Sequence, residues 1–150
     1  MVGGGGVIAT EGAPWLPALT WEPEMFCLDM RESERRERLQ RMDVAGRARA
    51  LVWGPYETMP RGVWRATASF LVDRWACRHA YRLEWGASTS YAVHEFVPGR
   101  EGLFEVSAEY EWTAEAEAEL RIILTESSLG GVFEFLGAKV CRIERSSAAV

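Results

Sequence analysis

Hydrophobic and polar residues alternate through residues 102–112. One parity is apolar and consists of Phe104, Val106, Ala108, Tyr110 and Trp112. The other parity is polar and consists of Glu105, Ser107, Glu109 and Glu111. A period of two, with aromatic side chains on one parity, is typical of a β-strand that buries one face and exposes the other. We expect this strand to lie at the centre of the fold, with a second sheet covering its apolar face.

Similar short segments follow one another through the second half of the chain. They predict strands at residues 49–53, 63–72, 79–85, 91–97, 118–126 and 132–143. Turn residues separate the segments, such as Pro60 with Gly62 and Pro98 with Gly99. Gly137 falls inside the last segment and predicts a β-bulge. Roughly seven or eight strands without a helix between them predict an all-β fold, an antiparallel jelly-roll-like β-sandwich.

The first 46 residues have a different character. Residues 3–6 are all glycine, and prolines follow at positions 14 and 17, which predicts an irregular arm. Four apolar residues are candidates for docking on a partner or a second copy, or for packing on their own domain: Trp15, Leu16, Trp21 and Phe26. Residues 31–42 contain Glu–Arg pairs four residues apart, which predicts one short polar helix. We therefore divide the chain into an arm with a helix (1–46), a sandwich domain (47–145) and a tail (146–150).

Charge and hydrophobicity narrow the class of partner. The 150 residues carry a formal net charge of -5, which disfavours nucleic acid and an anionic membrane surface as partners. No apolar run approaches the roughly 18 to 20 residues that a membrane span needs, and the first residues do not resemble a signal peptide. We therefore expect a cytoplasmic protein or a part of a larger assembly.

Patterns typical of catalysis and metal binding are weak. His79 and His94 are the only histidines, and neither has a nucleophile motif nearby. Cys27, Cys77 and Cys141 are widely spaced, which is typical of small buried or half-buried thiols rather than of a zinc site or a disulfide framework. We expect no enzymatic activity, no cofactor and no metal site.

Five short segments of the sequence together resemble a known group of modules. They are residues 54–56, 59–66, 98–102, 119–121 and 132–140, and they fall within roughly the last two thirds of the chain. The series resembles the jelly-roll modules, similar to carbohydrate-binding modules, that accompany bacterial glycosyltransferases and other polysaccharide enzymes. This resemblance implies a β-sandwich that binds a polysaccharide or another glycan without acting on it.

Sugar binding requires aromatic rings that cover the apolar face of a pyranose and polar groups that bond its hydroxyls. Three tryptophans have the parity of core residues: Trp53, Trp64 and Trp112. Trp75 lies in a predicted loop and Trp85 at a predicted strand end, so these two are the candidate platforms. The candidate polar residues share the outward parity of their strands: Arg82, Glu84, Glu109, Glu111, Glu119 and Arg121. They form one binding patch if their strands are neighbours, and otherwise they are ordinary cross-strand ion pairs.

The sequence leaves two functions open. The first is a non-catalytic polysaccharide-binding module. The second is a structural or assembly protein, such as an accessory subunit of a phage-like particle, which docks on protein partners or on itself through the N-terminal arm. The oligomeric state in solution, with and without the arm, distinguishes the two.

Overall fold

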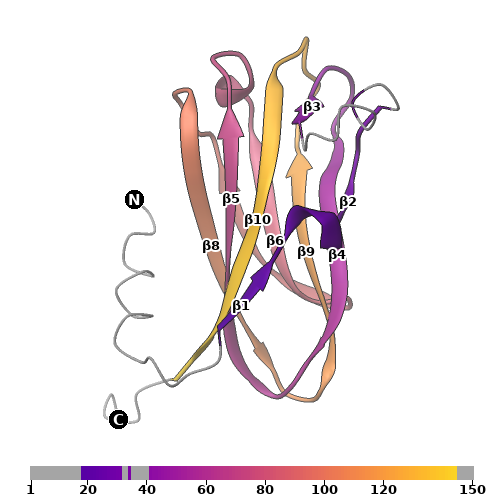
Figure 1. The fold of residues 1–150 in the computed structure, drawn as a ribbon, viewed down its shortest axis with the longest axis vertical. Coiled ribbons are helices and arrows are strands. Elements are labelled where there is room, and N and C mark those ends of the chain that lie inside the picture. The colour runs from indigo at the N-terminus through magenta and orange to yellow at the C-terminus, as the bar shows by residue number, and fades with distance from the viewer. Residues whose placement is uncertain (1–17, 32–33, 35–40, 145–150) are drawn as a thin grey trace.

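Two antiparallel sheets pack face to face in the computed structural model, which describes residues 18–31, 34 and 41–144 (Figure 1). Sheet A is formed by β1 (Ala18–Trp21), β3 (Arg41–Asp43), β5 (Gly62–Val72), β8 (Gly102–Trp112) and β10 (Val132–Ile143). Sheet B is formed by β2 (Cys27–Leu28), β4 (Arg49–Met59), β6 (Tyr81–Ala87), β7 (Ser90–Phe96) and β9 (Ala116–Leu124). Two single 3-10 turns are η1 (Pro23–Met25) and η2 (Ala76–Arg78). The predicted all-β sandwich is confirmed.

Most strand boundaries follow the alternation of the sequence. β5 and β10 agree with the predicted strands at 63–72 and 132–143 to within one residue. The predicted bulge at Gly137 is confirmed, because the pairing of β10 with β5 shifts register between Phe135 and Gly137. Gly137 has a φ of +105°, and a Cβ there would lie 2.6 Å from the backbone oxygen of Trp21. Glycine is therefore required both by the backbone conformation and by the close approach of β1.

The alternating strand at 102–112 is not central, as we had expected. The order of sheet A is β1-β10-β5-β8, so β8 is an edge strand and β5 and β10 occupy the middle. Val106 and Trp112 are buried, whereas Phe104 and Tyr110 are only half-buried at this edge. Alternation shows that one face of a strand is buried, but it does not show whether the strand has one neighbour or two.

The N-terminal segment crosses from one sheet to the other and closes one side of the sandwich (Figure 1). β1 pairs with β10, the chain turns through η1, and β2 then pairs with β4. Trp21 and Phe26 flank this turn and are 3% and 8% exposed. The ring of Phe26 lies 4.9 Å from that of Phe135, in an edge contact. The crossing is therefore held by aromatic side chains that enter the core.

This crossing corrects two of our expectations. Trp21 and Phe26 pack inside their own domain, so neither is available to dock a partner. The sandwich also begins by Ala18 rather than at residue 47, because β1, β2 and β3 pair with its strands. Trp15 and Leu16, the other two docking candidates, lie outside the described residues, as does the predicted tail at 146–150.

The helix predicted for residues 31–42 extends too far. Arg41 and Met42 belong to β3, which pairs with the beginning of β10. Met42 is fully buried, so its burial in sheet A outweighs the helical preference of the preceding polar residues. Most of the remaining predicted helix lies outside the described residues.

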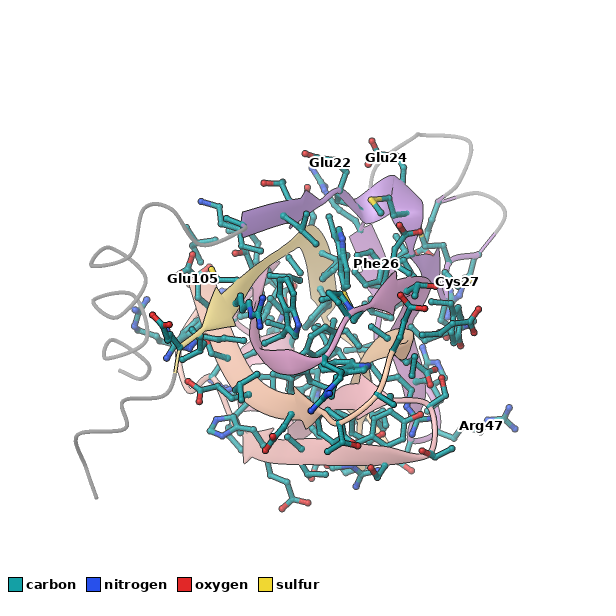
Figure 2. All side chains as sticks on the ribbon, turned by 90° about the horizontal axis from the view of Figure 1, so that it is seen from below. Glu22, Glu24, Phe26, Cys27, Arg47 and Glu105 are labelled. Carbon is teal, nitrogen blue, oxygen red and sulfur yellow. The ribbon has the colours of Figure 1, made fainter. Side chains whose placement is uncertain are left out.

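Aromatic rings fill much of the space between the two sheets (Figure 2). Phe70 and Phe133 stack with ring centroids 4.8 Å apart, and Trp85 meets Trp112 edge-on at 5.0 Å. Trp85 is fully buried, and its indole N–H donates to the backbone oxygen of Trp64 at 2.9 Å. The prediction that Trp85 is a sugar-binding platform is therefore wrong, because this side chain belongs to the core.

Replacement of Trp21 tests how much the N-terminal crossing contributes to stability. We expect Trp21→Ala to lower the free energy of unfolding by roughly 3–5 kcal/mol, because it leaves a large cavity beside Trp85. Leu19→Ala, on the same strand but 40% exposed, should change it by only about 0.5 kcal/mol. Urea unfolding of both variants measures the difference. Equal effects would show that the crossing contributes little to the fold.

Candidate functional site

The register of sheet B places five side chains in one row on its outer face. Cα pairing connects Cys27, Trp53, Arg121, Glu84 and Val93, one from each of the five strands. Residues opposite one another in an antiparallel sheet share a face. The neighbouring residues on β9, Leu120 and Ile122, are fully buried, so this row must point away from the core.

Trp53 lies in this row, which corrects its assignment to the core. The pairing of β4 with β9 shifts register between Ala50 and Val52, so two consecutive residues, Leu51 and Val52, are both buried. The parity of β4 changes at this bulge. Trp53 is consequently half-buried on the outer face, directly opposite Arg121.

A second row beside the first carries a carboxylate and an aromatic ring. Pro55, Glu119, Gly86 and Tyr91 are consecutive cross-strand partners. Gly86 has no room for a side chain, since a Cβ there would lie 2.2 Å from the backbone oxygen of Ser90. The Tyr91 hydroxyl donates to Glu119 Oε1 at 2.5 Å, so its side chain spans the position of Gly86.

Tyr56 completes the environment of Glu119. The pairing of β4 shifts register again between Pro55 and Thr58, and Tyr56 in this irregular stretch has a φ of +66°. A positive φ is strained for a residue with a large side chain, and such strain often occurs at functional sites. The Tyr56 hydroxyl donates to Glu119 Oε2 at 2.8 Å. Both oxygens of Glu119 therefore accept a phenolic hydrogen bond.

Arg121 links the two carboxylates of the face. Its Nη2 lies 2.5 Å from Glu84 Oε1, and its Nε lies 4.0 Å from Glu119 Oε2. Arg82 Nε donates to the other oxygen of Glu84 at 2.9 Å. The guanidinium carbon of Arg121 also lies 4.5 Å from the centre of the Tyr91 ring. We call these six residues the outer-face network: Tyr56, Arg82, Glu84, Tyr91, Glu119 and Arg121.

The network costs free energy to assemble. Glu84 and Glu119 are only 8% and 6% exposed, and removing a carboxylate from water costs several kcal/mol unless charged or hydrogen-bonding partners compensate. The two arginines and the two phenols supply that compensation. Arg121 Nε is buried and has no hydrogen-bond partner among the described residues. Glu84 Oε1 is likewise buried without a hydrogen bond of good geometry, so both atoms depend on their ion pairs for compensation.

Ionisation states are fixed by the same contacts. Burial, the hydrogen bond to Glu119 and its negative charge raise the pKa of Tyr56 to about 12. The same three causes, in the same order, raise the pKa of Tyr91 to about 12. Burial opposes the charge of Arg121, but the carboxylate of Glu84 outweighs it and raises the pKa of the guanidinium. At neutral pH the phenols are thus donors, and neither acts as a base.

The other predicted site residues lie elsewhere. Glu109 and Glu111 belong to β8 in sheet A, where Glu109 accepts a 2.9 Å hydrogen bond from Arg65 Nε. Trp75 is 50% exposed in the loop between β5 and β6. Arg82, Glu84, Glu119 and Arg121 are therefore the predicted residues that the fold brings together.

Three aromatic residues of this face were missed by the sequence analysis: Trp53, Tyr56 and Tyr91. Tyr91 was detectable, because the hairpin register of β6 and β7 places it beside outward Gly86. Trp53 and Tyr56 depend on two irregularities of β4 that interrupt its alternation. No group of three or more His, Cys, Asp or Glu side chains within the described ranges could hold a metal ion. The described part of the chain also contains no helix that is long and apolar enough to span a membrane.

Comparison with known proteins identifies the fold. No family model and no curated protein matches this sequence. The carbohydrate-binding module TmCBM61, solved with beta-1,4-galactotriose, matches with a TM-score of 0.50 and 7% identity over 85% of this chain and 88% of that chain. The C-terminal CBM6 of LamC from Zobellia galactanivorans matches with a TM-score of 0.49 and 11% identity, covering 84% and 100% of the two chains. The dimeric latent PorU of Porphyromonas gingivalis gives 0.46 and 12%, but 85% of this chain corresponds to only 12% of that one. The chain therefore has a jelly-roll β-sandwich fold similar to that of carbohydrate-binding modules.

The raised pKa values of the two tyrosines make a prediction about stability at high pH. The pKa of each tyrosine is about 12 in the folded protein and 10.0 in the unfolded chain. Their contribution to the free energy of unfolding is therefore fully present below pH 10 and is lost as the pH rises toward 12. We expect the melting temperature to fall over that interval, and to fall less in Tyr56→Phe and Tyr91→Phe. In the Glu119→Gln variant, Tyr56 and Tyr91 should ionise at a lower pH than in the wild type, because the charge of Glu119 is gone. A pH titration followed by phenolate absorbance measures this. Wild-type tyrosines that all ionise near pH 10 would contradict the network.

Proposed function

We propose that this chain is a non-catalytic carbohydrate-binding module that holds a polysaccharide on the outer face of sheet B. The observation that carries the proposal is the row in which Trp53 lies beside Arg121 and Glu84. An aromatic face next to fixed guanidinium and carboxylate groups matches the two sides of a pyranose, one apolar and one hydroxylated. The similar structure with bound galactotriose supports the class of ligand.

The proposed mode of binding assigns a task to each part of the face. The indole of Trp53 covers the apolar side of a sugar ring. Hydroxyls at the ring edge donate to Glu84 or Glu119 and accept from Arg121, whose guanidinium offers several N–H donors in a fixed plane. Because the network is already assembled in the free protein, the side chains lose little entropy when the sugar binds.

A binding role fits this network better than a catalytic role. Glu119 uses both oxygens to accept phenolic hydrogen bonds, and Glu84 uses both in ion pairs with arginines. A general acid or base must exchange a proton with the substrate within hydrogen-bond reach. Carboxylates occupied by internal partners are suited to positioning hydroxyls rather than to transferring protons.

Truncation of Trp53 tests the proposal. We expect Trp53→Ala to weaken binding of a neutral polysaccharide roughly tenfold or more, because buried aromatic anchors dominate binding energy. Titration calorimetry against a panel that includes β-1,4-galactan measures this, and Leu103→Ala, which removes an exposed apolar side chain from sheet A, is the control. No binding at millimolar sugar, or equal affinity in Trp53→Ala and the wild type, would refute the proposal.

A further inference from the structure

A second aromatic and charged cluster lies at one end of the sandwich, in the loop between β5 and β6 (Figure 1). Trp75 is 50% exposed there and lies between two arginines in the sequence. The guanidinium carbons of Arg74 and Arg78 lie 4.9 Å and 5.5 Å from the centre of its ring. Two guanidinium groups thus lie against the indole, at distances at which an aromatic ring attracts a cation.

The loop holds Trp75 in a fixed position. The carboxylate of Asp73 accepts the backbone N–H groups of Trp75 at 3.1 Å and Ala76 at 2.8 Å. Tyr81 donates its hydroxyl to the backbone oxygen of Ala76 at 2.6 Å from inside the core. Gly131 packs so closely on the loop that a Cβ there would lie 2.5 Å from the nitrogen of Ala76. A large aromatic ring, 50% exposed, therefore stands on a loop whose backbone is held in place.

The guanidinium groups of these two arginines are not engaged in ion pairs. Within the described residues, neither Arg74 nor Arg78 forms an ion pair with a carboxylate. Other arginines of the chain do so, namely Arg31, Arg41, Arg49, Arg65, Arg82 and Arg121. Of the nearby acidic groups, Asp73 bonds the loop backbone, and Glu126 lies 3.5 Å from His79 Nδ1. Arg74 does interact electrostatically with neighbouring Asp73, but neither guanidinium is held in an ion pair among the described residues, so both can bind an external anion.

A pocket of about 700 Å³ opens beside this cluster. Trp75 and Arg78 line it together with Leu129, which is fully exposed, and with Glu126. Trp75 and Leu129 offer apolar contact, Arg78 offers a positive charge, and the carboxylate of Glu126 accepts hydrogen bonds. The ligand that satisfies all of these has an apolar ring face, hydroxyl donors and one small anionic group.

We propose that Arg74, Trp75 and Arg78 form a second binding site, specific for an acidic saccharide that carries a carboxylate or a sulfate. The sugar ring packs between Trp75 and Leu129, its anion binds the guanidinium groups, and its hydroxyls donate to Glu126. Nucleic acid fits less well, because a phosphate backbone needs a track of basic residues and this cluster offers a pair. The site is independent of the outer face of sheet B, both in position and in the charge of its ligand.

The test compares charged and neutral oligosaccharides on the full-length protein. In the Trp53→Ala variant, which lacks the aromatic platform proposed for neutral glycans, we expect oligogalacturonate, or a sulfated oligosaccharide of equal length, to bind at least about tenfold more tightly than neutral oligogalactan at low salt, with the advantage shrinking as salt rises. Indole fluorescence and titration calorimetry measure the affinities. The two charged probes show which anion the site prefers, and binding of either one supports the proposal.

Matched variants locate the binding. Arg74→Gln with Arg78→Gln, and separately Trp75→Ala, should each reduce binding of the charged probe about tenfold. Arg47→Gln with Arg61→Gln removes the same charge from two exposed arginines elsewhere and should have little effect; Arg47 extends away from the molecule (Figure 2). Trp53→Ala should still bind the charged ligand. A failure of the outer-face proposal can therefore be distinguished from a failure of this one. Equal losses in both arginine pairs, or equal binding of the neutral and charged probes in the Trp53→Ala variant, would overturn the proposal.

Discussion

The parity of β9 determines both the core and the outer-face network. Leu120 and Ile122 are fully buried between the sheets, and fully burying such a side chain contributes roughly 1.5–3 kcal/mol. Their burial forces Glu119 and Arg121 to the opposite face, where β4 and β6 lie on either side of them. A shift of one residue would put two charges into the core. The hydrophobic effect acts on Leu120 and Ile122, and through the alternation of β9 it positions Glu119 and Arg121 on the outer face.

The outer-face network costs free energy that its contacts must recover. Two carboxylates that are nearly buried must recover the free energy of hydration that they lose, and isolated surface ion pairs contribute only about 0–1 kcal/mol. The strained backbone of Tyr56, whose hydroxyl reaches Glu119, adds a further cost. Costs of this kind are typical where a sequence is selected for binding rather than for folding.

The alternation of apolar and polar residues predicted which face of each regular strand is buried. It failed where a strand is longer than predicted or contains a bulge. Trp85 was taken for a strand end, yet β6 continues to Ala87, so the parity that it shares with Tyr81 sends it into the core. Trp53 was assigned inward because a bulge near Leu51 cannot be recognised from residue types alone. The grouping of Glu84 with Arg121 required strand order, which depends on long-range pairing and leaves no local signal.

The distribution of charge separates the two proposed sites. In the outer-face network, Glu84 and Glu119 balance Arg82 and Arg121, so the network itself is neutral. At the loop end, Arg74 and Arg78 form no ion pair within the described residues, whereas Asp73 bonds the loop backbone and Glu126 lies beside His79. A neutral glycan thus gains nothing electrostatically at the loop, and an acidic one gains nothing at the face. Because like charges on the rest of the protein repel an anion, the acidic ligand must be held by short-range contacts at Trp75 and its two arginines.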